Sequence, residues 1–186
     1  MATQPSRYRF ENGAWLIEIE LKTVQQLFNS LDPSPFHIKD LDSAAEAWIV
    51  GAVRDFPVGT QLRLVLHLPR DELARAEQAQ IGQALAGYFG DRRETLRRDL
   101  RYLMRTGRAA LLIGLAFLAA CLTVRELAAA VMPGTAGTIA NEGLLIIGWV
   151  AMWRPIEIFL YDWWPLRRMA RVHEKIAAMP VEIRAR

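Results

Sequence analysis

Two long apolar stretches constrain the fold of this chain more than any other feature of its sequence. They run over residues 109–132 and 140–161, and a short segment rich in Pro, Gly and Thr separates them. An α-helix rises 1.5 Å per residue, so either stretch is long enough to cross the roughly 30 Å hydrocarbon core of a bilayer. The pair therefore predicts a transmembrane hairpin, with helix 1 over 109–132, an external turn over 133–139 and helix 2 over 140–161.

The distribution of basic residues predicts the orientation of this hairpin. Seven arginines lie between Arg92 and Arg108, and Arg167, Arg168, Arg171 and Lys175 follow the second stretch, whereas the turn from Pro133 to Gly143 has no Lys or Arg. Cytoplasmic loops next to membrane spans carry the excess of positive charge. We therefore expect both termini in the cytoplasm and the protein in a bacterial inner (cytoplasmic) membrane as a multi-pass protein.

The amino-terminal residues 1–70 predict a small cytoplasmic α+β unit. Residues 14–22 and 62–68 alternate between apolar and polar side chains with the period of half-buried strands. A helical segment near 24–31 and a helix that Ser43 and Glu46 open as a capping box lie between them. The predicted order is strand-helix-helix-strand. Because an isolated two-stranded ribbon is marginal in water, we expect a homo-oligomer whose copies complete the sheet, although a monomeric sheet backed by helices stays open.

Two amphipathic basic helices are predicted to flank the hairpin. Residues 71–108 lack proline and repeat leucine and other apolar residues at three-, four- and seven-residue intervals, which is typical of a long connector helix, bent near Gly87 and Gly90. Residues 162–186 predict a second amphipathic basic helix as the tail. The fold class is thus a membrane α-helical hairpin joined by a long helix to a small α+β unit.

The basic residues beside the predicted membrane are candidate lipid-binding residues. Arginine clusters attract anionic headgroups, with a benefit of about 1 kcal/mol per charge near the surface. Two simpler interpretations stay open, namely a topology signal alone and a solvated face that pairs with acidic residues of the α+β unit. The candidates are Arg93, Arg97, Arg101, Arg105, Arg108, Arg167 and Arg168.

Three residues near the inner end of the second apolar stretch form a possible pore or ligand site. Arg154 and Glu157 are charged residues inside a predicted span, and Pro155 between them should kink the helix. The alternative is that both charges are interfacial anchors that pair with each other and reach water.

No grouping of residues in the sequence predicts catalysis. The three histidines, His37, His67 and His173, have no second ligand at metal spacing, and the glycines form no nucleotide-binding pattern. The single cysteine, Cys121, lies within the first apolar stretch and should face lipid or another helix. We therefore expect no enzyme, no cofactor, no metal site and no nucleic-acid partner.

Three segments carry a resemblance to known proteins. At LFNSLDPSPF, LRLVLHLP and WRPIEIFLYDWWPLRR the chain resembles small two-pass bacterial inner-membrane proteins with a cytoplasmic amino-terminal unit. The resemblance implies the same topology and transfers no activity or site. Together with the patterns above, it leads us to expect a homo-oligomeric scaffold or regulatory protein without catalytic activity. The alternative is a small oligomeric ion channel or transporter with Arg154 and Glu157 near its cytoplasmic mouth.

Overall fold

The computed structural model describes residues 7–33, 39–131 and 134–186. Most of the expected loop at 32–36, His37 and the junction of the first apolar stretch with the external turn lie outside these ranges. The chain divides into two compact units. The first, which we call the sheet unit, comprises Met1–Thr95 and Arg168–Arg186, and the second, which we call the helical-pair unit, comprises Leu96–Arg167.

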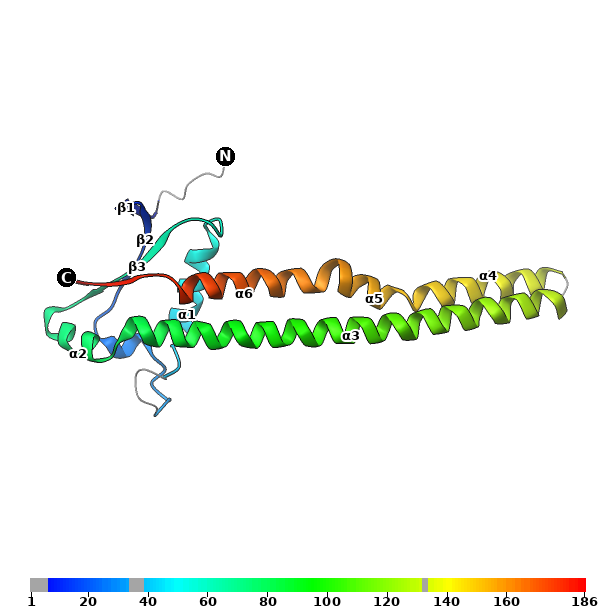
Figure 1. Ribbon diagram of the computed structural model, residues 1–186, viewed down its shortest axis with the longest axis horizontal. Helices are drawn as coiled ribbons and strands as arrows, with labels where there is room; N and C mark the ends of the chain where they lie inside the picture. The colour runs from blue at the N-terminus through cyan, green and yellow to red at the C-terminus, as the bar shows by residue number, and fades with distance from the viewer. Residues whose placement is uncertain (1–6, 34–38, 132–133) are drawn as a thin grey trace. The chain divides into compact units, whose positions relative to one another are not determined.

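The sheet unit contains a four-stranded sheet in the order β1-β2-β3-β4 (Figure 1). The pair β1·β2 is antiparallel, and the pairs β2·β3 and β3·β4 are parallel. The two strands that the sequence predicts, β2 and β3, are present, and the sheet has two more. Because both additional strands come from the same chain, the expected shortage of strands does not arise. The strands are β1 (Arg9–Glu11), β2 (Ala14–Glu20), β3 (Leu62–Leu68) and β4 (Val181–Ala185).

Local signals explain the two additional strands. Asn12 and Gly13, between β1 and β2, have φ angles of 50° and 79°, as expected for the Asn-Gly turn that favours a tight hairpin. At the other end of the chain, the expected tail helix ends at Ala177, and Pro180 cannot continue it. The residues after Pro180 then pair with β3.

Helices of the sheet unit cover one face of the sheet. Asp42 is the N-cap of α1 (Ser43–Arg54), because its Oδ1 accepts hydrogen bonds from the backbone N–H groups of Ala44 (2.9 Å) and Ala45 (3.3 Å). The cap is therefore one residue earlier than the predicted Ser43 capping box. The other elements are the 3₁₀ turns η1 (Val24–Leu27) and η3 (Arg70–Glu72), α2 (Leu73–Gln78), the first part of α3 (Ile81–Val131) and most of α6 (Trp163–Ala177).

The predicted bend of the connector helix lies elsewhere. The helix is divided at residues 79–80, where Gln80 takes a left-handed backbone conformation with φ of 47°. From Ile81 onward α3 continues through Gly87 and Gly90 without a break. A glycine in a helix lowers its stability by about 1 kcal/mol but does not by itself require a bend.

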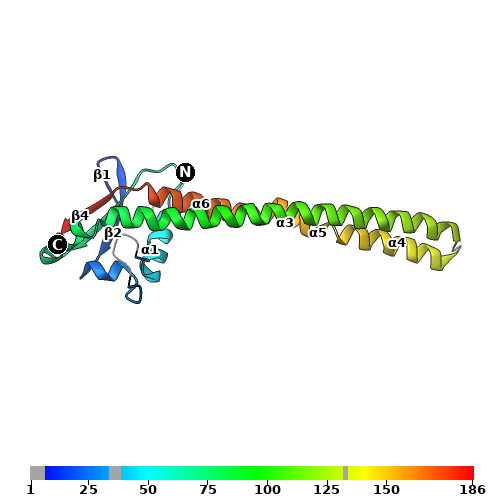
Figure 2. The same cartoon turned by 60° about the horizontal axis from the view of Figure 1, so that its bottom comes forward.

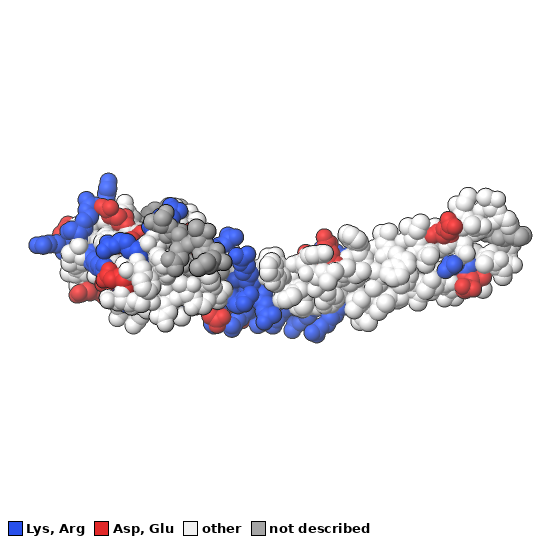
Figure 3. Space-filling view, turned by 90° about the horizontal axis from the view of Figure 1, so that it is seen from above, with Lys and Arg blue, Asp and Glu red and all other residues white. Residues whose placement is uncertain are grey.

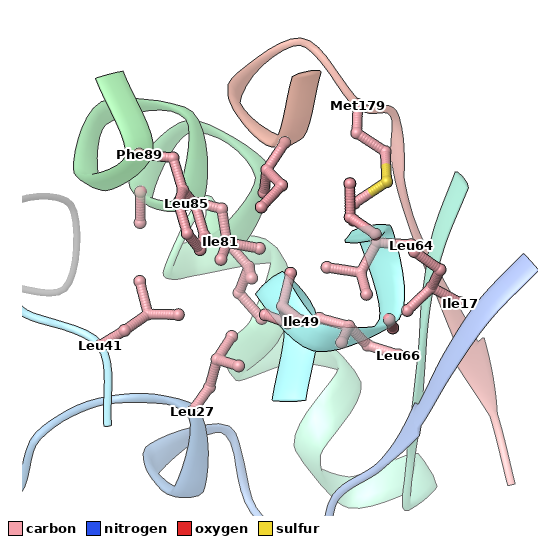
Figure 4. Close-up of a cluster of buried hydrophobic side chains, with 14 of the residues drawn as sticks. Ile17, Leu27, Leu41, Ile49, Leu64, Leu66, Ile81, Leu85, Phe89 and Met179 are labelled. Atoms are coloured by element: carbon pink, nitrogen blue, oxygen red, sulfur yellow. The ribbon is translucent and has the colours of Figure 1, made fainter. Parts of the chain in front are cut away.

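The core of the sheet unit lies between the sheet and these helices. Ile17, Leu64 and Leu66 of the covered sheet face are at most 1% exposed. They belong to one buried cluster with residues of α1, α3 and α6. Figure 4 shows side chains of α1 and α3 that meet the sheet residues in this cluster, among them Ile49, Ile81, Leu85 and Phe89.

The helical-pair unit consists of the later part of α3 and the helical segments that return beside it. In both Figure 1 and Figure 2, α3 and α4 run side by side in opposite directions. Small residues allow the close approach, since a Cβ on Gly148 would lie 2.8 Å from a Leu118 methyl group and 3.2 Å from Cβ of Cys121. Cys121 therefore faces the neighbouring helix. The returning segments are α4 (Thr135–Val150), α5 (Trp153–Glu157), the π-helical turn η4 (Ile158–Asp162) and the start of α6.

The structure has two helical stretches that are long and apolar enough to cross a membrane. They are Ile81–Val131 and Thr135–Ala177, and only 17% and 22% of their most apolar windows are buried. Large apolar side chains such as Leu112, Ile113 and Trp153 are each 70% exposed. A core helix of a water-soluble domain would bury such residues.

Candidate functional site

A three-residue ion-pair group is the most distinctive polar feature of the helical-pair unit. Nη1 of Arg154 donates to Oε2 of Glu157 at 2.9 Å and to Oδ2 of Asp162 at 3.0 Å. The side chains of Arg154, Glu157 and Asp162 are 59%, 42% and 31% exposed. One guanidinium thus serves two carboxylates, and the group carries a net charge of −1 on the surface of the helical pair.

The π-helical turn η4 explains why Asp162 joins this group. In a regular α-helix, the residue seven positions on lies within about 20° of the first around the axis, whereas the eighth lies about 80° away. A π turn holds one residue more than an α turn, so Asp162 lies close to where a seventh residue would lie relative to Arg154. The sequence prediction included Arg154 and Glu157 but missed Asp162, because no local pattern announces a π turn.

Pro155 lies beside this group, as its sequence position requires, and the helix is interrupted one turn before it. Proline has no N–H to donate to the carbonyl oxygen of Ala151. The helix is interrupted between α4 and α5, at residues 151–152, where the N–H of Met152 turns back to the carbonyl oxygen of Trp149 at 3.0 Å. The carbonyl oxygen of Ala151 lies 3.0 Å from where a Cβ of Gly114 would stand. The predicted disturbance by proline is therefore present, and α3 packs close against it.

The predicted lipid-binding arginines are in different surroundings. In the sheet unit, Nη1 of Arg93 pairs with Oε1 of Glu174 at 3.1 Å, so its charge is already partly compensated. Arg167 lies with its guanidinium carbon 5.7 Å from the ring centre of Trp163. Figure 3 shows basic side chains gathered in one band beside a long surface with few charges. The remaining candidates, all of them exposed, are Arg97, Arg101, Arg105, Arg108 and Arg168.

A second polar contact of the helical-pair unit lies toward its other end. Nε of Arg125 donates to Oδ1 of Asn141 at 2.6 Å and links α3 to α4. An arginine in an apolar helical stretch is costly in a membrane unless it is paired or reaches water. The contact supplies a neutral but polar partner, and sequence spacing could not have paired these two residues.

The uncovered face of the sheet carries an ion-pair network that the sequence analysis missed. Arg184 of β4 donates to Glu182 at 2.7 Å and to both carboxylate oxygens of Glu11, at 3.0 and 3.1 Å. Beneath the network, Leu16 and Val65 are 1% and 0% exposed. Further pairs are Arg63–Glu182, His67–Glu18, Arg9–Glu18 and Arg186–Glu20.

The network lowers the pKa of two of its carboxylates, Glu11 and Glu182. Hydrogen bonds from Arg184 lower the pKa of Glu11, and those from Arg184 and Arg63 lower the pKa of Glu182. Hydrogen bonds to Glu182 and Glu11 raise the pKa of Arg184. Glu11, Glu182 and Arg184 therefore stay charged near neutral pH and form a set of ion pairs.

A smaller group joins α3 to the elements packed on it. The hydroxyl of Tyr88 donates to Oε2 of Glu46 at 2.8 Å and accepts from Arg92 at 2.9 Å. Burial is the main cause that raises the pKa of Tyr88. Nearby in the sheet unit, burial lowers the pKa of His173, whose Nδ1 has no hydrogen-bond partner among the described residues. These groups hold helices together.

Within residues 7–33, 39–131 and 134–186, no three His, Cys, Asp or Glu side chains converge in a way that could hold a metal ion. Asp42 caps α1, and Asp32 accepts the backbone N–H of Asp40 at 2.8 Å. Comparisons with protein-family models, curated proteins and solved structures give no match. The arguments about function therefore rest on this chain alone.

Proposed function

We propose that this chain is a two-pass protein of the bacterial inner membrane, with both termini in the cytoplasm, that functions as a homo-oligomeric scaffold or regulatory protein without catalytic activity. The exposed apolar surface of the helical-pair unit carries the proposal. Residues 109–124 of α3 hold no charged side chain, which is about 24 Å of helix. Arginines precede this segment, and the turn from Pro133 to Gly143 lacks them. Because positive charge gathers on the cytoplasmic side of a membrane span, this distribution supports a cytoplasmic position for the arginine-rich end of each span.

The ion-pair group of Arg154, Glu157 and Asp162 supports the oligomeric part of the proposal. The shortage of strands no longer does so, since β1 and β4 complete the sheet. A charged residue at the centre of a bilayer costs about 2.5 to 3.5 kcal/mol on insertion scales, and exposed charges beside an apolar surface favour a cover or a path to water. A second copy of the chain would provide such a cover.

The sheet unit supports a structural role rather than catalysis. Its uncovered face is occupied by carboxylates and arginines that satisfy one another. Its sheet joins β1 and β2, at residues 9–20, with β4 at Val181–Ala185, so the sheet forms only after β4 has been made. We expect its partners to be the bilayer and further copies, and no particular partner protein is indicated.

The exposed arginines support contact with anionic headgroups. We expect the exposed arginines Arg97, Arg101 and Arg168 to contribute to this contact. Arg93, which is less exposed and pairs with Glu174, is also part of the predicted set. Titration of the protein in zwitterionic nanodiscs with a soluble, short-chain anionic phospholipid tests this point. Binding should weaken with salt, since screening shortens the reach of surface charges.

Two measurements test the proposed topology and assembly. Reporter fusions at the two termini should both report the cytoplasm, and termini on opposite sides would contradict the two-pass proposal. Size measurement in a mild detergent at low micromolar concentration should give a complex larger than one chain. A clean monomer under these conditions would defeat the scaffold proposal.

A channel or transporter is the second candidate, and the interrupted helix beside Arg154 and Glu157 favours it. Pro155 and the π turn are irregular backbone of the kind that lines pathways in transporters. Flux of ions from proteoliposomes is the test. A flux that Arg154→Ala and Glu157→Ala both abolish supports the channel, whereas a flux unchanged by both substitutions removes these residues as its basis.

A further inference from the structure

Two arginines of the helical-pair unit carry charge that none of the described residues of their chain compensates. Arg105 and Arg108 of α3 are exposed. In the part of the chain that the structure describes, neither forms a hydrogen bond or an ion pair. Their surroundings thus differ from those of Arg93, which is paired with Glu174.

An acidic surface, opposite in charge to Arg105 and Arg108, lies on the returning helix of the same unit. Glu157 and Asp162 share the single guanidinium of Arg154, which leaves one negative charge in excess. Both carboxylates remain partly exposed. Each can therefore accept further hydrogen bonds from a cation that approaches from outside the chain.

The basic and acidic pairs lie at the same level along the helices. A Cβ on Gly107 would stand 2.8 Å from Cγ2 of Ile158, so these two residues face each other. Arg108 and Glu157 are the immediate neighbours of this contact and differ in level by no more than a few ångströms. Because the helices are antiparallel, Arg105 and Asp162 are both displaced from it toward the same end. The two arginines thus match the two acids in level and in order.

The same contact places the two pairs on opposite sides of the helical pair. Each residue turns an α-helix by about 100°. Arg108 is one step after the contact residue of α3, and Glu157 is one step before the contact residue of a helix that runs the other way. These steps rotate the two side chains to opposite sides. Arg108 and Glu157 therefore cannot neutralise each other within one chain.

We propose that a second copy of the chain docks here, with Arg105 and Arg108 of one copy against Glu157 and Asp162 of the next. This inference rests on the proposed homo-oligomeric function and names its interface. The two arginines and the two acids have opposite charges, and they lie at matching levels when two chains insert in the same direction. One contact of this kind would cover both the basic pair and the acidic pair. Charges interact more strongly near hydrocarbon than in water. Since the contact joins two different surfaces, it is head-to-tail, a kind of contact that forms a ring when the rotation between copies closes.

Charge reversal and its rescue in one chain test this interface. Arg108→Glu and Glu157→Arg each place like charges across it, and each should raise the concentration needed for assembly at least tenfold. The double variant with both changes restores an opposite pair at every contact and should assemble as the unchanged chain does. An intrachain explanation cannot give this rescue, because the two positions lie on opposite sides of the helical pair.

Arg171→Glu is the matched control. It makes the same change in net charge as Arg108→Glu, but at an exposed position of the sheet unit, and should leave assembly unchanged. Reporter fusions verify that every variant keeps its orientation. The measurement is size in zwitterionic nanodiscs or mild detergent over a range of concentrations, repeated with anionic lipid.

Each other outcome overturns the inference in a distinguishable way. If both single variants assemble normally, the interface lies elsewhere and the homo-oligomeric function stands. If Arg108→Glu acts only in anionic lipid and the double variant does not recover, the occupant of the basic pair is a lipid headgroup. If the unchanged chain is a monomer, the proposed function fails together with its interface.

Discussion

The two units place the same residue types in opposite environments. Phe89 and Phe117 both belong to α3, yet Phe89 of the sheet unit is 0% exposed and Phe117 of the helical-pair unit is 44% exposed. The charged residues show a second contrast, in whether they have partners. In the sheet unit Glu11, Glu182 and Arg184 satisfy one another, whereas Arg105 and Arg108 of the helical-pair unit have no such partner among the described residues.

This difference shows that the units are built for different surroundings. A water-soluble core hides apolar side chains and lets charges meet water or one another. A helical pair that exposes its apolar side chains is suited to an apolar environment, in which an unpaired charge would be costly. Substitutions matched between the two units therefore test the assignment of each environment.

The largest effect is expected from truncating the two phenylalanines. Phe89→Ala should lower the free energy of unfolding of the sheet unit by about 3 to 5 kcal/mol, because it opens a cavity in the core. Phe117→Ala should change stability by less than about 0.5 kcal/mol, as exposed substitutions do. Hydrogen exchange of the β2 and β3 amides in mild detergent measures the first effect. Equal losses from both variants would contradict the contrast between the units.

A smaller effect is expected where the helices of the helical-pair unit approach closely. Gly148→Leu should destabilise the pair by about 1 to 3 kcal/mol, since even a Cβ there would overlap Leu118. Gly143→Leu on the same helix is the control, because a Cβ at Gly143 meets nothing within 4 Å. Thermal unfolding of both variants in detergent measures the difference. A Gly148→Leu variant as stable as the control would show that the helices do not pack at this point.

The third effect is a pH dependence of the sheet unit. Burial lowers the pKa of His173, opposed by the charge of Glu46 and aided by that of Arg92. The unfolded chain then binds a proton that the folded chain resists, so the free energy of unfolding should fall as the pH drops below about 6.5. His173→Leu should remove this dependence between pH 7 and 5. Unfolding midpoints across this range decide the matter, and a slope in His173→Leu equal to that of the unchanged chain would refute the role of His173.

The smallest effect should come from the network on the uncovered sheet face. Arg184 lowers the pKa of Glu11 and Glu182, so its stabilisation is present above about pH 4.5 and is lost as the pH falls through the lowered values. Arg184→Gln should make the melting temperature depend less on pH between pH 5 and 3. Arg9→Gln removes a smaller contribution to the lowered pKa of Glu11 and should flatten that profile less. A profile unchanged by Arg184→Gln would mean that solvent screens the network.

Parts of the candidate site followed from the sequence and parts did not. Arg154 and Glu157 are three residues apart, so their pairing follows from helical periodicity alone. Asp162 joins them only through a π turn, and Arg105 and Arg108 gained significance only when the contact of Gly107 with Ile158 fixed their level. Likewise, the Asn12–Gly13 turn was a readable hairpin signal, whereas the pairing of β4 with β3 joins residues more than a hundred positions apart.

The sequence by itself determined the two apolar helical stretches, the alternation of β2 and β3 and the concentration of arginine beside the first stretch. These features are local, because composition and periodicity act over a few turns of chain. Only the tertiary structure decided that the chain completes its own sheet, that Arg93 is paired and that the basic and acidic pairs lie level on opposite sides. These features depend on contacts between segments that are far apart in the sequence. No local pattern encodes which of the distant residues will form such a contact.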